Sequence, residues 1–505
     1  MHELDNPANI PVISVPGIPQ EEFADAFSVM QEAYVPATEN EPVYGFTHPF
    51  CGPGGAYGAC WWQLDTSLAL CGAKWVNIPF SENVLRGFKA VQREKGRIPL
   101  HGPDVLLDPE HKCSSVPKLF QAAYEVLERT HDPELLNEIY PVLKAYLDWW
   151  LSARIEEKTG LIYAIVEEYL PGRNTPLCAI ETNVEVTVGC KIVSKLAAIL
   201  GKEDEARYYR EKMRHHAELI RTLLWDNDRK IFMSYDPMTS KFEGKIYSTV
   251  FDTLKNGVAD NEQIDYLLRY LQDDALFQWN SVCLTTAAKT DKCYNETPGV
   301  YAACQWEGSI WSMRNYTVIE GLDDIGRFDL SSYLSWKTVT QFSGNYAEFL
   351  NPPDSSGHGV KRYVWTASQY VQILIERIFG IRYSNYLNTL QIMPNIPKAC
   401  YGQKLAIRDL LLPGGAKLDV CVSSDNSGSD ICVNYSIIPG RIRDNKNLVV
   451  ALPCYGGNFV AVGAECCTLE HNYGKICKTV RPIEIDPNGN TITGEVHFCH
   501  EKREK

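Results

Sequence analysis

The sequence predicts a mostly helical fold, an (α/α)6 barrel of six inner and six outer helices followed by a small C-terminal β-sandwich domain. The barrel is predicted because amphipathic helices follow one another in pairs over residues 41–392, with one set of loops rich in Trp, Asp, Glu and Gly. The sandwich is predicted because residues 393–505 contain short β-branched runs separated by Pro-Gly, Gly-Gly and Asn-Gly turns. Residues 1–40 form an N-terminal arm with one helix.

Apolar residues at helical spacing mark each predicted helix. In the arm, Phe23, Phe27 and Met30 recur at the interval of one helical face. Pro133 and Gly160 are boundary signals at the two ends of one long predicted helix. No consensus recurs at a fixed period, which disfavours a solenoid of helical repeats. The predicted helices span 20–34, 116–132, 133–160, 183–202, 203–226, 261–274, 309–322 and 363–380, and the predicted strands span 417–425, 429–438, 447–453, 458–465 and 491–499.

The composition limits the classes of binding partner and indicates the cellular compartment. The 505 residues carry a formal net charge of −14, which argues against nucleic acid and anionic membrane surfaces as partners and fits a small polar substrate. Aromatic residues make up 11% of the chain, and aromatic rings are common platforms for sugar rings. The 17 cysteines are scattered and form no CxxC pair, so we expect a cytoplasmic enzyme with free thiols, without disulfides and without a zinc site. The sequence shows no secretory signal and no apolar run of about 20 residues.

The stretch "CGPGGAYGACWWQLDTSLALCG", residues 51–72, is the first of four candidate site segments. Trp61, Trp62 and Asp65 occur just where an apolar helix begins. An acid in the first helical turn is favoured by the helix dipole alone. The alternative is a sugar site, in which the tryptophans stack on the ring and Asp65 accepts hydrogen bonds from two hydroxyls.

Two further segments combine carboxylates or tryptophans with loop ends. In residues 160–183, Glu167 and Glu168 precede a Pro-Gly turn and Arg173. Neighbouring carboxylates in a tight, partly apolar loop raise the pKa of one of them, as a general acid requires, although a solvated acidic loop fits equally well. In residues 304–316, Trp306 and Trp311 lead into a helix, as sugar-lining rings or as a core pair.

The fourth segment is "NYAEFLNPPDSSGHG", residues 345–359. Glu348 precedes Pro352 and Pro353, which exclude a helix interior and stiffen the loop that follows. Two separated carboxylate regions among tryptophans are typical of glycoside hydrolysis. That reaction uses one acid to protonate the departing oxygen and one carboxylate to activate water or attack the anomeric carbon.

In this order, the motifs resemble those of helical-toroid glycosidases, namely glycoside hydrolase family 63, the trehalases of family 37 and the mannosylglycerate and glucosylglycerate hydrolase-like group. The similar segments, which cover roughly residues 44–380, are "WWQLDT", "REKGRIPLHGPD", "SSVPKLFQAAYEV", "QWEGSIWSMRNYTVIEGL" and "NYAEFLNPPDSSGHGVKRYVWTAS", the last of which contains Trp365.

The resemblance implies an inverting mechanism that needs no metal or organic cofactor. Glu348 matches the position of the general base. The acid is expected in "VEEYLPGRN", where Glu168 is the first choice and Glu167 the second because of their spacing to Arg173. Glu307 stands where the family usually has Arg, and it would suit a substrate hydroxyl and repel an anionic aglycone.

The function that the resemblance implies is that of an inverting, exo-acting α-glucosidase-type enzyme acting on a small glucoside or oligosaccharide. An α-L-rhamnosidase or another inverting toroid glycosidase shares the same acid and base logic. A sugar epimerase would use paired histidines, for which His48, His101 and His358 are the candidates. A noncatalytic carbohydrate-binding protein is the alternative of a different class.

Overall fold

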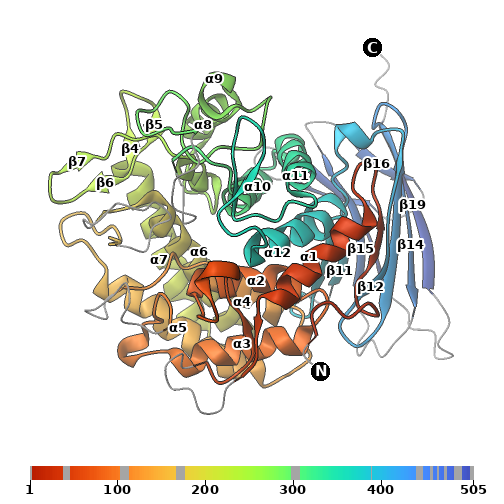
Figure 1. Ribbon diagram of the computed structural model, residues 1–505, viewed down its shortest axis with the longest axis horizontal. Helices are drawn as coiled ribbons and strands as arrows, with labels where there is room; N and C mark the ends of the chain where they lie inside the picture. The colour runs from red at the N-terminus through yellow and green to blue at the C-terminus, as the bar shows by residue number, and fades with distance from the viewer. Residues whose placement is uncertain are drawn as a thin grey trace.

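The computed structural model describes residues 3–37, 46–102, 113–165, 177–296, 307–387, 389–438, 447–454, 459–462, 466–470, 475–482 and 492–500. Helices are the main secondary structure up to Ile378, and a region of strands follows (Figure 1). The mostly helical class with a C-terminal strand region is therefore confirmed.

The helices agree with the sequence prediction in most places. Within the described residues they are α1 (Gln20–Glu32), α2 (Gln63–Ala73), α3 (Ile78–Val91), α4 (Leu119–Leu127), α5 (Leu135–Ala153), α6 (Ile180–Ile199), α7 (Glu203–Leu223), α8 (Asn261–Gln272), α9 (Asp274–Phe277), α10 (Ser312–Asp324), α11 (Phe328–Phe342) and α12 (Val364–Gln372). A π-helical segment, Ile373–Ile378, continues α12. Helices α3, α9 and α11 were not predicted from the sequence.

The C-terminal region contains two sheets. The six-stranded sheet has the order β1-β12-β13-β14-β19-β16, and the five-stranded sheet has the order β10-β11-β15-β18-β17. Their strands are β1 (Val12–Ser14), β10 (Ile381–Ser384), β11 (Thr389–Ile392), β12 (Lys404–Leu411), β13 (Lys417–Ser424), β14 (Asp430–Ile438), β15 (Asn447–Cys454), β16 (Phe459–Val462), β17 (Cys466–Glu470), β18 (Lys475–Pro482) and β19 (Ile492–His500). Short hairpins lie in the helical region: β2 (Tyr34–Val35) with β3 (Phe50–Cys51), β4 (Trp225–Asp226) with β5 (Ile231–Phe232), β6 (Tyr235–Asp236) with β7 (Lys241–Phe242), and β8 (Phe349–Leu350) with β9 (Gly357–His358).

Alternating side chains give the six-stranded sheet one buried and one outer face. In β13, Leu418, Val420 and Val422 are buried, while Asp419 and Cys421 lie on the opposite face. The arm contributes β1, which pairs with β12 at one edge of this sheet. The arm is thus joined to the C-terminal strands as well as to the helices.

Helices α2 and α12 approach each other closely at Gly72. A Cβ at this position would lie 2.9 Å from Cα of Ser368, so a larger residue would push the two helices apart. The Ser368 hydroxyl accepts a hydrogen bond from the backbone N–H of Gly72 at 2.6 Å and donates to the carbonyl of Leu68 at 2.8 Å. This contact joins the last turn of α2 to the middle of α12 and so holds side by side the two helices whose first turns carry Asp65 and Trp365.

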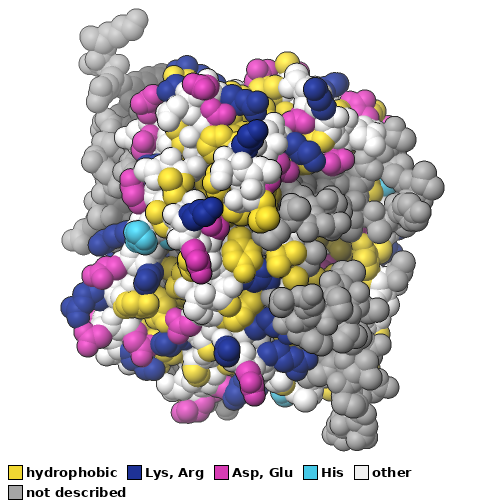
Figure 2. Space-filling view, turned by 90° about the vertical axis from the view of Figure 1, so that its left-hand side faces the viewer, with side chains coloured by type: hydrophobic (Ala, Val, Ile, Leu, Met, Phe, Trp, Pro, Cys, Tyr) yellow, Lys and Arg dark blue, Asp and Glu magenta, His cyan; other side chains and the backbone are white. Residues whose placement is uncertain are grey.

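The surface carries charges of both signs. Figure 2 shows Lys and Arg side chains interspersed with Asp and Glu over the face that lies away from the C-terminal strands. Eleven cysteines in the described part of the chain are free thiols. In that same part, no helix is both long enough and apolar enough to cross a membrane.

Candidate active site

Glu348 lies fully buried just before β8, with both carboxylate oxygens hydrogen-bonded. Tyr57 Oη donates to Oε1 at 2.9 Å, and the backbone N–H of Val360 donates to Oε2 at 3.0 Å. The backbone N–H of Glu348 also donates to the carbonyl of Val360 at 2.8 Å. The hairpin that follows Glu348 therefore turns back and fixes its carboxylate.

Asp65 lies in the first turn of α2 and is 5% exposed. Burial raises its pKa to about 7; the hydrogen bond that Tyr363 Oη donates to Oδ1 at 2.7 Å lowers the pKa, while the nearby charge of Glu348 raises it. The carboxyl groups of Asp65 and Glu348 thus interact electrostatically, although 283 positions separate residue 65 from residue 348 in the sequence.

Tyrosine rings connect these two carboxyl groups. The ring centroids of Tyr57 and Tyr363 are 6.1 Å apart, and Tyr57 lies edge-on to Trp62 at 5.9 Å. Tyr363 in turn packs edge-on against Trp365 at 4.9 Å. The site therefore consists of two acids held by two phenols within an aromatic cluster, which suits a polar ring with apolar C–H faces.

The two tryptophans before α2 have different surroundings. Trp62 is half-buried and its ring lies 4.5 Å from that of His101, with which it also forms a β-bridge. Trp61 is 1% exposed and packs against Phe46 and Phe88. Trp62 is therefore the more accessible of the two rings, and Trp61 belongs to the core behind it.

The third and fourth sequence segments meet through a backbone bridge. Ile310 and Leu350 exchange two backbone hydrogen bonds of 2.9 Å. This bridge places Trp311 parallel to Phe349, with ring centroids 5.2 Å apart, and Trp365 packs against Trp311 at 5.5 Å. Trp311 and Trp365 are both buried, so the fold brings them together beside Glu348 as a packed pair.

Glu307 is half-exposed and has a basic neighbour. Its Oε1 lies 3.6 Å from Lys245 Nζ and accepts a long hydrogen bond of 3.5 Å from Tyr247 Oη. Four of the other predicted site residues, Glu167, Glu168, Arg173 and Trp306, lie outside the described residues. Their predicted roles stay predictions.

The two tyrosines that hold the acids were not singled out from the sequence. Tyr57 and Tyr363 are 291 and 298 residues from the carboxyl groups that they contact, so no local spacing relates them. Asn183, at the start of a predicted helix, fits a capping role by sequence, but the structure gives it another task. Its side chain accepts from the backbone N–H of Ile162 and donates to the carbonyl of Ile162, both at 2.8 Å, and so fastens the segment before residue 166 to α6.

We predict that Gly359→Ala lowers kcat/KM by about 100-fold, because a shift of about 1 Å in a reacting group has this order of effect. Gly359 has a φ of +70°, and a Cβ there would overlap Oε2 of Glu348. The matched control is Gly201→Ala, where φ is also +70° but nothing lies within 4 Å. The positive φ alone should cost each variant about 1 kcal/mol of stability, the overlap adds to this loss in Gly359→Ala, and only Gly359→Ala should lose activity. Equal activity in the two variants would contradict the placement of Glu348.

We predict that Asp65→Asn stabilises the protein, and increasingly so as the pH rises. Because the folded-state pKa of Asp65 is raised from 3.8 to about 7, the unfolded chain ionises first and folding loses free energy between these values. The unfolding free energy of Asp65→Asn relative to the parent protein should therefore grow by about 2–3 kcal/mol from pH 5 to pH 8. Urea unfolding at the two pH values measures this change, and a difference that stays constant or shrinks would show that Asp65 ionises normally.

Two family models match the chain. Residues 178–366 match the mannosylglycerate hydrolase MGH1-like glycoside hydrolase domain, and residues 62–267 match the bacterial alpha-L-rhamnosidase 6 hairpin glycosidase domain. Both models describe glycoside hydrolase domains, which confirms the resemblance predicted from the order of the motifs.

Individual relatives agree with these models. An uncharacterized protein of Borreliella burgdorferi is 20% identical over 300 residues, which are 58% of this chain and 60% of that protein. A mannosylglycerate hydrolase of Rubrobacter radiotolerans is 24% identical over 188 residues, 36% of this chain and 40% of the relative. The chain thus matches 60% or less of the length of these two curated relatives.

A solved structure shares the fold. The family 63 mannosylglycerate hydrolase of Thermus thermophilus in complex with glucose superposes with a TM-score of 0.56 and 16% identity. The match covers 69% of this chain and 98% of that structure. Over the matched part, this chain therefore has the fold of that hydrolase.

Proposed function

We propose that this chain, which shares the fold of six-hairpin glycosidases, is itself an inverting, exo-acting glycosidase of the α-glucosidase type that cleaves a small glucoside or oligosaccharide. The observation that carries the proposal is the buried carboxylate of Glu348, held by Tyr57 and the Val360 N–H and electrostatically coupled to Asp65. Burying a carboxylate is costly in a folded protein, and active sites are where buried, interacting carboxylates concentrate.

In the proposed reaction, Glu348 takes a proton from a water molecule as that water attacks the anomeric carbon. The bond between the anomeric carbon and the glycosidic oxygen breaks, and a protonated carboxyl group gives its proton to the departing oxygen. Glu168 is the first choice for this acid and Glu167 the second. The sugar product has the inverted configuration, and the two carboxyl groups are expected about 6.5–9.5 Å apart.

Substrate binding is assigned to the residues around this pair. Asp65 accepts hydrogen bonds from sugar hydroxyls and Trp62 lines the ring, and the proposal keeps the predicted substrate-binding roles of Trp306 and Arg173. Trp61, Trp311 and Trp365 hold these groups from behind. This division of tasks is supported by the burial of all three tryptophans: Trp311 and Trp365 pack on each other, and Trp61 packs on Phe46 and Phe88.

The same proposal includes the architecture and the compartment. We propose that the helices close as an (α/α)6 barrel over about residues 41–380, that residues 1–40 form the arm and that the following strands form a sandwich. We also move the boundary between the helical domain and the C-terminal strands from residue 392 to Gly380, because β11 pairs with β15 and so belongs to the strands.

The proposed compartment is the cytoplasm. The free thiols of the described cysteines fit such a reducing environment.

An α-L-rhamnosidase-like activity is the second candidate, favoured by the rhamnosidase family model over residues 62–267. An epimerase has less support, because the three candidate histidines contact different partners. His101 packs on Trp62, His358 shares a 2.7 Å hydrogen bond with the Ser356 hydroxyl, and His48 lies near Arg86. A noncatalytic carbohydrate-binding protein would lack turnover altogether.

The pair of Glu307 and Lys245 bears on the aglycone. Glu307 alone would repel an anionic aglycone such as glycerate, but Lys245 Nζ, 3.6 Å away, offsets much of that charge. The substrate panel should therefore contain mannosylglycerate and glucosylglycerate beside neutral glucosides.

The test is hydrolysis of nitrophenyl glycosides, short glucosides and the two glycerate glycosides. We expect turnover of at least one α-glucoside and its loss in both Glu348→Gln and Glu168→Gln. A rhamnoside as the best substrate would select the second candidate. Activity that survives both substitutions would overturn the mechanism.

A further inference from the structure

Three metal-ligating side chains gather on the outer face of the six-stranded sheet, away from the candidate active site. Cys432 on β14 is directly opposite His497 on β19, and Asn434 is directly opposite Glu495. The core face of the same strands carries Val433 and Val496, which are buried. Because side chains alternate along a strand, the register places Cys432, Glu495 and His497 together on the outer face.

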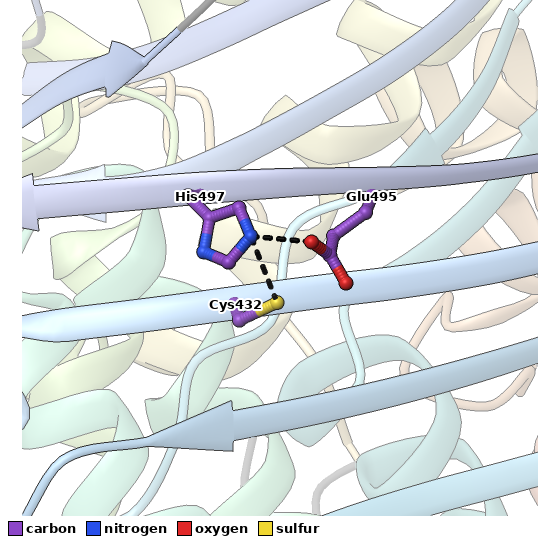
Figure 3. Close-up of side chains that lie close together, drawn as sticks. All are labelled: Cys432, Glu495 and His497. Carbon is purple, nitrogen blue, oxygen red and sulfur yellow. Dashed lines mark hydrogen bonds and ion pairs between the residues drawn. The ribbon is translucent and has the colours of Figure 1, made fainter.

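The donor atoms of this group are close to one another (Figure 3). His497 Nε2 lies 2.5 Å from Glu495 Oε1 and 3.8 Å from Cys432 Sγ, and the three donor atoms all lie within 4.8 Å of one another. In a tetrahedral zinc site the sulfur and nitrogen ligands are about 3.5 Å apart, and the nitrogen and oxygen ligands about 3.4 Å, as metal–ligand distances of about 2.0–2.3 Å require. Side-chain adjustments of less than about 1 Å therefore bring the three atoms onto one ion.

The geometry does not fit a nucleophilic Cys-His-Glu triad. In such a triad the acid orients one ring nitrogen and the nucleophile contacts the other. Here both contacts converge on the same nitrogen, Nε2 of His497, as Figure 3 shows.

We propose that Cys432, Glu495 and His497 bind a divalent metal ion of the zinc type, with water in the fourth position. A thiolate, an imidazole and a carboxylate are the three ligand classes that Zn²⁺ uses in proteins. On binding, the thiol of Cys432 releases its proton, and His497 carries its remaining proton on Nδ1. The thiolate and the carboxylate then balance the two positive charges of the ion.

A neighbouring amide supports the thiolate. Asn434 Nδ2 donates a hydrogen bond to Cys432 Sγ at 3.3 Å, which orients the sulfur and stabilises its negative charge. The bound ion would link β14 to β19, whose ligands are 65 residues apart in the chain. Because more than half of the His497 and Glu495 side-chain surfaces is exposed, we expect an accessible site that exchanges its metal readily.

Cobalt(II) is the probe, because its thiolate complexes absorb in the near ultraviolet and zinc complexes do not. The full chain is freed of metal with a chelator, kept reduced with a phosphine and titrated with Co²⁺. We expect a thiolate charge-transfer band that saturates at one equivalent and disappears when Zn²⁺ is added. Zn²⁺ should also raise the melting temperature of the metal-free protein.

Matched variants separate this site from the other thiols of the chain. Cys432→Ser should abolish the band, and the isosteric Glu495→Gln should weaken Co²⁺ binding by about tenfold or more. The control is Cys421→Ser, which removes another thiol from the same outer face, on the neighbouring strand β13. The Co²⁺ charge-transfer band should remain in this control variant. Circular dichroism of the metal-free variants checks the fold.

A parent protein without a band, or a band of full strength in Cys432→Ser, overturns the proposal. These outcomes do not depend on glycosidase activity, so the metal site and the proposed reaction stand or fall separately.

Discussion

Glu348→Gln is expected to lower kcat by about 10²–10⁴-fold while leaving the fold intact, because a positioned general base contributes a factor of this size. Glutamine keeps the shape of the side chain. Its Oε1 can accept the hydrogen bond from the Val360 N–H, and its amide can donate to Tyr57 Oη, which then acts as an acceptor. The amide cannot take a proton from water. KM should change little, since the lost interaction belongs to the transition state.

The matched control for Glu348 lies in the same loop. Asp354 is six residues away and accepts hydrogen bonds from the N–H and hydroxyl of Ser356 at 2.9 and 2.7 Å, but it is exposed to solvent. Asp354→Asn should retain parental kcat. Steady-state kinetics on the best substrate of the panel measures both variants. Equal losses in the two would mean that the loop, not the base, limits the reaction.

Lys74→Met is expected to destabilise the protein by about 3–5 kcal/mol, the cost of leaving buried carboxylates without their cation. Lys74 is 2% exposed and follows α2, at the opposite end of that helix from Asp65. Its Nζ contacts Glu125 and lies 2.7 Å from Glu376. Burial alone would lower the pKa of Lys74, but the two glutamates outweigh it and raise the pKa. Removing the ammonium group leaves Glu125 and Glu376 buried without the cation that lies between them.

Two further variants test the cause of that loss. Lys89→Met removes a lysine that pairs with Glu138 at 2.9 Å but is half-exposed, so it should cost less than about 1 kcal/mol. The double variant Lys74→Met/Glu125→Gln should recover part of the stability, because one of the two carboxylates is then neutral. Denaturant unfolding followed by fluorescence gives all three values. A loss for Lys74→Met no larger than that for Lys89→Met would exclude a structural role for the buried network.

Strong periodicity made much of the fold predictable. Helix α7 was expected over 203–226, and in the structure it spans Glu203–Leu223. It was predictable because acids occupy its first turn and one of its faces is apolar. Helix α11 was missed, since Ser331, Ser335 and Thr338 are buried on it and blur the apolar face. Tertiary packing, rather than the helix propensity of its residues, makes this segment helical.

Short strands and distant contacts were the other omissions. Strands β10 and β11 have four residues each, too few for an alternating pattern to stand out. Within the site, the chain order revealed Glu348 and Asp65 but not the tyrosines that hold them. The prediction that no zinc site exists relied on the absence of CxxC spacing, and strand register brings Cys432 and His497 together without it.

In the proposed mechanism, Glu348 directs water to the anomeric carbon from the face opposite the leaving group. Proton NMR during the first minutes of hydrolysis of an α-glucoside reveals the configuration of the sugar product before it equilibrates in solution. If Glu348 acts in this way, β-glucose appears first and α-glucose forms later by mutarotation. Initial release of α-glucose would mean retention through a covalent intermediate and would contradict the role assigned to Glu348.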